Sequence, residues 1–112
     1  MKKIEAIFRE ERLEAVKKAL EQNGFIGMTI SDVSGRGQQK GVTLQWRAGD
    51  YQVEFLPKIK LETICHDDDC ETVVQTIQKA ARTGRIGDGK IFILPVEDAM
   101  RIRTGEKGEK VI

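Results

Sequence analysis

Aromatic residues and cysteine are scarce in this sequence. Four Phe, one Trp and one Tyr are the aromatic residues among 112, and there are two cysteines. Because aromatic rings are so few, aliphatic side chains must fill most of a hydrophobic core. Two cysteines are too few for the disulfide scaffold of a small secreted domain. A chain of this length is expected to form a single domain, residues 1–112.

Long apolar segments are also missing. No stretch approaches the roughly 20 apolar residues that a transmembrane helix needs. The N-terminal segment Met1–Glu5 carries charges where a signal peptide needs an apolar run. The sequence therefore predicts a cytoplasmic protein.

An excess of charge of one sign is absent as well. Nineteen Lys and Arg residues nearly balance eighteen Asp and Glu residues, which leaves a net charge of +1. A general nucleic-acid-binding domain usually carries a basic excess on one face. We therefore expect no nucleic-acid partner, and any anion-binding site must be formed locally.

Hydrophobic periodicity predicts six regular elements. Ile4, Ala6 and Phe8 alternate with polar residues, as in a strand that is buried on one face. Apolar residues then recur at helical spacing after Glu11 and again after Cys70. The expected strands are 2–8, 25–33, 56–64 and 90–96, and the expected helices run from 11 to the Asn23–Gly24 stop signal and from 70 to about 82.

This order of elements predicts a fold class. Strand, helix, strand, long loop, strand, helix, strand is two βαβ units in tandem, as in an α+β ferredoxin-like sandwich with both helices on one face of the sheet. The long loop between the second and third strands, 38–55, contains Gly41 and Gly49 and alternates weakly at 42–46. A connection this long inside a small domain is uncommon and usually functional.

The segment Gly84–Lys90 nearly matches the phosphate loop of many NTPases. Ile91 stands where that motif needs Ser or Thr, and the segment leads from a helix into a strand rather than from a strand into a helix. A P-loop enzyme is therefore not expected. Closely spaced glycines followed by Lys90 can still bring backbone N–H groups and a charge to an anion. A plain helix-to-strand turn that merely needs glycine is the alternative.

Two further basic segments are open to two interpretations. Arg101 and Arg103 would share one face of an extended segment and could bind phosphate together, or they could form a solvated basic end. The segment Gly35–Gly41 contains three glycines, and taken by itself it indicates a flexible turn. Tyr51 lies in the middle of the long loop, where it could be modified or contact a partner.

The segment Cys65–Cys70 contains residue types that bind metals, but we expect it to be structural. Asp67, Asp68 and Asp69 are suited to cap the second helix, and Cys70 begins the apolar stripe of that helix. With His66 the single histidine in the chain, no catalytic triad or acid–base pair is apparent. The sequence predicts a protein that is not an enzyme.

Taken together, these segments resemble the PII family of nitrogen-regulatory signalling proteins, over essentially the whole chain. The resemblance rests on Met1–Ile7, Gly27–Thr29, Gln39–Gly41, Phe55–Lys58, Thr83–Phe92 and Arg101–Glu106, which occur in the order and spacing of the family. It implies a mobile T-loop at about 37–55, a B-loop at about 82–90 and a C-loop at about 97–112. It also implies a homotrimer with a ligand cleft between each pair of subunits.

The resemblance assigns ATP or ADP to this cleft. Gly87, Gly89 and Lys90 would surround the phosphates, with Arg101 and Arg103 reaching in from the neighbouring subunit. The nucleotide-binding residues implied in this way are Ile7, Thr29, Gly35, Gly37, Gln38, Glu62, Ile64, Gly87, Asp88, Gly89, Lys90, Arg101 and Arg103. Many family members have an arginine at the position of Gln38, which leaves the preference between ATP and ADP open.

The resemblance also implies that 2-oxoglutarate binds together with Mg-ATP. Gln39 would ligate Mg²⁺, and Lys58 would pair with the distal carboxylate of the 2-oxo acid. The implied residues of this effector site are Gln39, Lys40, Gly41 and Lys58.

The resemblance implies that the T-loop is the segment through which the protein acts on its partners. Family members act on an ammonium transporter channel, which would be the one link to a membrane, and on enzymes or kinases of nitrogen metabolism. Tyr51 occupies the position that is modified in some bacterial members. The rival interpretations are a nitrogenase-regulating member of the same family and a ferredoxin-like nucleotide-binding enzyme with slow ATP hydrolysis. A full-length loop that contains Tyr51 favours the general regulatory type.

Overall fold

A four-stranded antiparallel sheet and two helices form the body of the protein. The computed structural model describes residues 1–37, 42–46, 49–53 and 55–112, with 42–46 and 49–53 described by their backbone. The elements are β1 (Lys2–Arg9), η1 (Glu10–Arg12), α1 (Leu13–Gln22), β2 (Thr29–Gly35), β3 (Val42–Trp46), β4 (Gly49–Val53), β5 (Leu56–Cys65), η2 (Asp67–Asp69), α2 (Cys70–Ala81), β6 (Gly89–Pro95) and η3 (Glu109–Val111).

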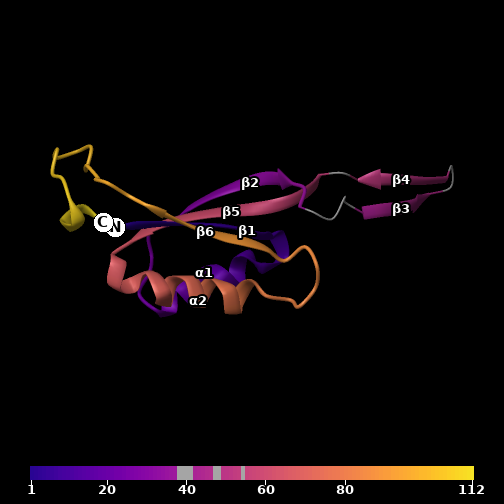
Figure 1. The fold of residues 1–112 in the computed structure, drawn as a ribbon, viewed down its shortest axis with the longest axis horizontal. Helices are drawn as coiled ribbons and strands as arrows, with labels where there is room; N and C mark the ends of the chain where they lie inside the picture. The colour runs from indigo at the N-terminus through magenta and orange to yellow at the C-terminus, as the bar shows by residue number, and fades with distance from the viewer. Residues whose placement is uncertain (38–41, 47–48, 54) are drawn as a thin grey trace.

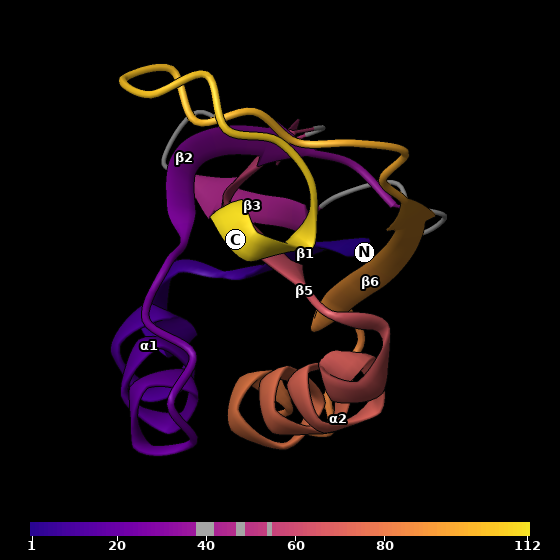
Figure 2. The same cartoon turned by 90° about the vertical axis from the view of Figure 1, so that its left-hand side faces the viewer.

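The strand order β2-β5-β1-β6 is that of a ferredoxin-like fold, which confirms the predicted fold class. β1 pairs with β5 on one side and with β6 on the other, and β2 pairs with β5, always antiparallel. Both helices cover the same face of the sheet (Figure 1). Viewed along the strands, α1 and α2 lie side by side beneath that face, and no α-helix of the described residues lies on the opposite face (Figure 2).

The core lies between the sheet and the two helices. Every second residue of β1 and of β5 points into it, because successive side chains of a strand face opposite sides. The buried hydrophobic residues that form the core are Ile4, Ala6, Phe8, Val16, Leu20, Ile59, Leu61, Cys65, Val73, Ile77 and Ala81. Cys70 packs against this cluster, so both cysteines are part of the core packing, as expected. Burial raises the pKa of the Cys65 thiol.

The predicted C-terminal end of α1 is confirmed, whereas its start lies at Leu13 rather than at residue 11, because Glu10–Arg12 form a 3-10 turn. Val16 and Leu20 are its buried residues, and the helix stops at Gln22, directly before the Asn23–Gly24 turn. Gly24 has φ +85°, a left-handed conformation that costs glycine little.

Three local predictions need correction. Residues 25–28 are not part of a strand: β2 begins at Thr29, and the Thr63 hydroxyl donates a hydrogen bond to the Gly27 carbonyl (2.7 Å). Residues 67–69 form a 3-10 turn without a side-chain cap; Asp67 instead lies 3.0 Å from the N-terminal amino group.

The third difference concerns the long loop. The weak alternation at 42–46 belongs to a real strand, β3, which pairs with β4 in a separate two-stranded sheet. This hairpin lies beyond the ends of β2 and β5, away from the main sheet (Figure 1). The expected loop boundaries 37–55, 82–90 and 97–112 stay predictions.

Arg12 connects the start of α1 to the end of α2. Its Nε and Nη2 both donate to the Ala80 carbonyl, at 2.9 and 2.6 Å. That carbonyl is one of the last four of α2, which have no partner within the helix. A charged group there also complements the negative end of the helix dipole.

Replacing Arg12 with Gln is therefore expected to lower the free energy of unfolding by about 1 kcal/mol, because two charge-assisted hydrogen bonds are lost. Lys18→Gln, an exposed change on α1, is the control and should alter stability by less than about 0.5 kcal/mol. Urea unfolding of the two variants compares them. Equal effects would show that the Arg12–Ala80 contact contributes nothing specific.

Candidate functional site

The sheet face that lacks helices carries a compact ion-pair network, which we call the ionic quartet: Lys3, Glu5, Lys60 and Glu62. The Lys60 ammonium lies 3.1 Å from Glu62 and 3.5 Å from Glu5, and Lys3 lies 3.4 Å from Glu62. The side-chain hydrogen bond between Lys60 and Glu62 raises the pKa of the lysine and lowers that of the glutamate. The charges of the quartet satisfy one another.

The loop that leads from α2 into β6 is built around the Asp88 carboxylate. It accepts hydrogen bonds from the backbone N–H groups of Thr83 (2.8 Å) and Gly84 (2.9 Å), from the Thr83 hydroxyl, and from Arg9 Nε (3.0 Å). Burial alone would raise the pKa of Asp88, but these hydrogen bonds outweigh it and hold the pKa well below its usual range. The loop 83–88 is therefore closed by its own carboxylate.

Two cations at the adjoining strand ends hold the loop carbonyls. Arg9, the last residue of β1, donates from Nη2 to the Ile86 carbonyl (2.7 Å), and the Lys58 ammonium of β5 donates to the Gly87 carbonyl (2.5 Å). Burial, together with the nearby charge of Arg9, lowers the pKa of Lys58. The loop thus sits on two positive charges that lie side by side.

Gly87 and Gly89 have backbone conformations that favour glycine, with φ +101° and +106°. At Gly89 the backbone also passes so close to β1 that an added Cβ would lie 1.8 Å from the Ile7 carbonyl oxygen. The glycines at these two positions are therefore required by the path of the backbone.

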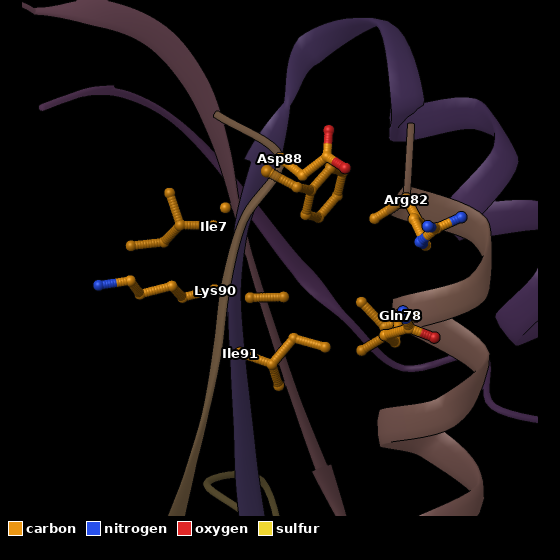
Figure 3. Close-up of a pocket in the computed structure, with 11 residues that line it drawn as sticks. Ile7, Gln78, Arg82, Asp88, Lys90 and Ile91 are labelled. Atoms are coloured by element: carbon orange, nitrogen blue, oxygen red, sulfur yellow. The ribbon is translucent and has the colours of Figure 1, made fainter. Parts of the chain in front are cut away.

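A groove of about 400 Å³ lies beside this loop, between β6 and the C-terminal half of α2. Gln78 of α2 and Arg82, the residue after this helix, border it opposite Ile91, whereas Ile7 and Lys90 point to the other side of the sheet (Figure 3). The groove and the side chains of Ile7 and Lys90 are thus on opposite faces.

The structure brings several predicted nucleotide residues together in two groups. Ile7 and Lys90 are paired residues of β1 and β6, and Thr29 and Glu62 are paired residues of β2 and β5. Lys58, Lys60, Glu62 and Ile64 share the face away from the helices, as predicted from strand parity.

Lys90 and Thr29 lie on the two edge strands, β6 and β2, whereas Ile7 and Glu62 lie on the adjacent central strands β1 and β5. β2 and β6 are separated by β5 and β1, so at about 4.8 Å per strand Thr29 and Lys90 are roughly 14 Å apart. The residues of the two edge strands are therefore not direct neighbours within one chain.

The predicted geometry of Arg101 and Arg103 is wrong. Both lie in a turn closed by the Gly105 N–H on the Arg101 carbonyl (2.7 Å), so the alternation of an extended segment does not apply. Arg101 pairs with Glu106 (3.0 Å), and the intervening Ile102 is 98% exposed. The contact of these two arginines with phosphate, which the resemblance implies, stays a prediction.

Four of the predicted residues, Gln38, Gln39, Lys40 and Gly41, lie outside the described residues. Gly35 ends β2, and Gly37 follows it in an irregular segment. For Tyr51 the structure describes its backbone in β4. The carboxylate of the remaining residue, Asp88, accepts hydrogen bonds from the loop and so organises it, and its role in nucleotide binding stays a prediction.

Sequence reasoning missed Arg9 and Thr83. Arg9 follows Ile7 by two residues in the same strand, so both lie on one face of the sheet. This parity could have identified Arg9 as a candidate site residue. Its contact with a loop 79 residues away could not be inferred from periodicity.

Comparison with known proteins identifies the family. The family described as "Nitrogen regulatory protein P-II" matches residues 1–106. The chain is 54% identical over its full length to "Nitrogen regulatory protein P-II 2" of Methanothermobacter thermautotrophicus, of which it covers 97%. It is 52% identical to "Nitrogen regulatory protein P-II" of Azospirillum brasilense and 54% identical to that of Microchaete diplosiphon, with full coverage of both chains.

These matches agree with the arrangement of the chain itself. A ferredoxin-like sheet carries a hairpin between β2 and β5 and a glycine-rich loop before β6. Among the described residues, no helix is both long and apolar enough to cross a membrane. The fold, the resemblance of the motifs and the full-length identity lead to one conclusion: the chain belongs to the P-II family of nitrogen regulatory proteins.

Proposed function

We propose that this chain is a signalling protein that binds ATP or ADP and, with Mg-ATP, 2-oxoglutarate. The observation that carries the proposal is that two cations, Arg9 and Lys58, contact the glycine-rich loop 83–89 at one end of the sheet, and that a third, Lys90, follows this loop in β6. Such a cluster suits a phosphate or carboxylate, because charge-assisted hydrogen bonds to anions are about twice as strong as neutral ones. Bound Mg²⁺, for which Gln39 is the proposed ligand, would neutralise part of the phosphate charge.

The site is proposed to be shared between subunits of a homotrimer. Thr29 and Lys90 lie on opposite edges of the sheet, so both can contribute to one cleft when the β2 edge of one copy approaches the β6 edge of the next. Head-to-tail contacts of this kind produce closed rings. Arg101 and Arg103 would then enter the cleft of the neighbouring copy, after Arg101 releases Glu106.

Regulation would follow from a population shift. The proposed ligand residues Gln39 and Lys58 flank the segment that contains the β3–β4 hairpin. A ligand that contacts one arrangement of this segment better than another favours that arrangement by its difference in affinity. The hairpin segment 37–55 is then the surface that partners recognise, with an ammonium transporter channel and nitrogen-metabolism enzymes or kinases as the proposed partners. The relatives are named regulatory proteins, which supports a cytoplasmic regulator rather than an enzyme.

Isothermal titration calorimetry with ATP, ADP and 2-oxoglutarate, with and without Mg²⁺, tests the proposal. We expect 2-oxoglutarate to bind when Mg-ATP is present and not otherwise. Lys90→Ala should weaken ATP binding by about tenfold or more, because a charged partner of the phosphates is lost. Lys79→Ala, an exposed change on α2, is the matched control and should leave affinity unchanged. Binding of 2-oxoglutarate without nucleotide, or no nucleotide binding, would contradict the assignment.

A further inference from the structure

Two of the three cations proposed to bind anions, Lys58 and Arg9, already donate hydrogen bonds to the loop itself. The Lys58 ammonium donates to the Gly87 carbonyl (2.5 Å), and Arg9 donates to the Ile86 carbonyl (2.7 Å) and to Asp88 (3.0 Å). A carboxylate or phosphate that approaches Lys58 must therefore compete with a carbonyl oxygen.

The geometry of the peptide bond fixes what these contacts do to the backbone. In a planar trans peptide, the C=O and N–H groups point in opposite directions. Because the carbonyls of Ile86 and Gly87 point at Arg9 and Lys58, the N–H groups of Gly87 and Asp88 point away from these two cations. An anion held by Lys58 in this arrangement would face the negative end of the peptide dipole rather than its N–H end.

The loop can change at this point without unfolding. Asp88 remains tied to the backbone N–H groups of Thr83 and Gly84, which fixes the other end of the loop. Gly87, at φ +101°, lacks a side chain that would resist rotation of the adjoining peptides. An added Cβ there would meet Arg9 Nη2 at 3.1 Å, so the close approach of the guanidinium also depends on glycine. Rotation is therefore expected to be confined to the peptides on either side of Gly87.

We propose that Lys58 is a positioning residue of the loop, which holds the Gly87 carbonyl until an acidic ligand takes its ammonium group. The identity of that ligand as a 2-oxo dicarboxylate rests on the function proposed above. Once Lys58 is paired with a carboxylate, the peptide between Gly87 and Asp88 is free to turn its N–H toward the anionic ligands. The acid and the nucleotide phosphates then act on the same peptide, and each must raise the affinity of the other by the same factor.

The positioning effect is tested first without any ligand. Nuclear magnetic resonance of labelled protein would compare the native chain with Lys58→Met, which keeps the length of the side chain and removes its charge. We expect shifts of the Gly87 carbonyl ¹³C and the Asp88 amide ¹⁵N resonances, and faster hydrogen exchange of the Gly87 and Asp88 amides by about threefold or more. Lys60→Met is the control: Lys60 lies on the same face of β5 but pairs with Glu5 and Glu62, so the loop resonances should stay in place. Unchanged loop resonances in Lys58→Met would overturn the proposal.

The second step adds Mg-ATP and 2-oxoglutarate to the native chain. The Gly87 and Asp88 resonances should move away from their ligand-free positions, and binding of the acid should raise the affinity for Mg-ATP. If calorimetry shows saturable binding but these resonances do not move, the release of the loop is contradicted. The assignment of the ligands would still stand in that case. Absence of any binding heat would contradict the proposed function, and the ligand-free comparison would then decide alone whether Lys58 holds the loop.

Discussion

Gly89→Ala is expected to lower the free energy of unfolding by about 3 kcal/mol or more, or to prevent folding. The Cβ would lie 1.8 Å from the Ile7 carbonyl oxygen and 3.0 Å from the Phe8 Cα, both of which are backbone atoms of β1 that cannot rotate away. The residue would also have to adopt φ +106°, which costs an L-amino acid strain that glycine does not experience. β1 lies in the middle of the sheet, so it cannot move without disturbing both of its neighbours.

The matched control is Gly105→Ala. Gly105 also has a positive φ, +74°, but an added Cβ would have no neighbour within 4 Å. The control variant therefore has the backbone strain of a positive φ without the steric overlap of the Cβ. It should lower the free energy of unfolding by about 1 kcal/mol. Urea unfolding measures both, with circular dichroism in case Gly89→Ala does not fold. Similar stabilities of the two variants would show that the approach of Gly89 to β1 is not a constraint on the fold.

Asp88→Asn is expected to lower the free energy of unfolding by about 2 kcal/mol at neutral pH, since the carboxylate serves four donors. The amide cannot accept from all of them and brings its own N–H₂ group toward Arg9. The side chain is 24% exposed, so water can replace part of the loss. Asp32→Asn, an exposed change on β2, is the control and should stay within about 0.5 kcal/mol.

The effect of Asp88 should also depend on pH in a defined direction. Its pKa is lowered on folding, so its contribution is fully present above the pKa of an unfolded aspartate, about 3.9, and is lost as the pH falls through the folded value. The stability difference between the native chain and Asp88→Asn should therefore be constant near neutrality and shrink below about pH 4. Unfolding curves at a series of pH values measure it. A difference that does not change on acidification would contradict the assignment.

Predictions from sequence succeeded where a single element carries its own signal. The alternation of Ile4, Ala6 and Phe8 and the parity of Lys58 with Glu62 both follow from the two-residue repeat of a strand, and both are confirmed. The same reasoning failed for Arg101 and Arg103, because it assumed an extended backbone where a hydrogen-bonded turn exists. Parity is informative only when the backbone conformation is known.

The candidate site was predicted in part for the same reason. Glycines and Lys90 before a strand mark a loop that anions can approach, whatever the rest of the fold does. The resemblance to the family placed the remaining residues, and full-length identity confirmed the family. Arg9 was missed because its partner Asp88 is 79 residues away, and local patterns carry no information on such a contact.

What the sequence determined by itself is the order of the four strands of the main sheet and of the two helices, the fold class and the family, since periodicity and motif spacing can be read along the chain. Because aromatic residues are scarce, the sequence also predicted a mainly aliphatic core. Because the net charge is near zero, it predicted that any anion-binding site is formed locally. The tertiary structure decided how that site is held. Arg9 and Lys58 meet the loop 83–88 because β1 and β5 end beside it, and Thr29 and Lys90 are kept apart because β5 and β1 lie between them. Those relations depend on strand order, and strand order is fixed when the helices and the sheet bury their apolar faces together.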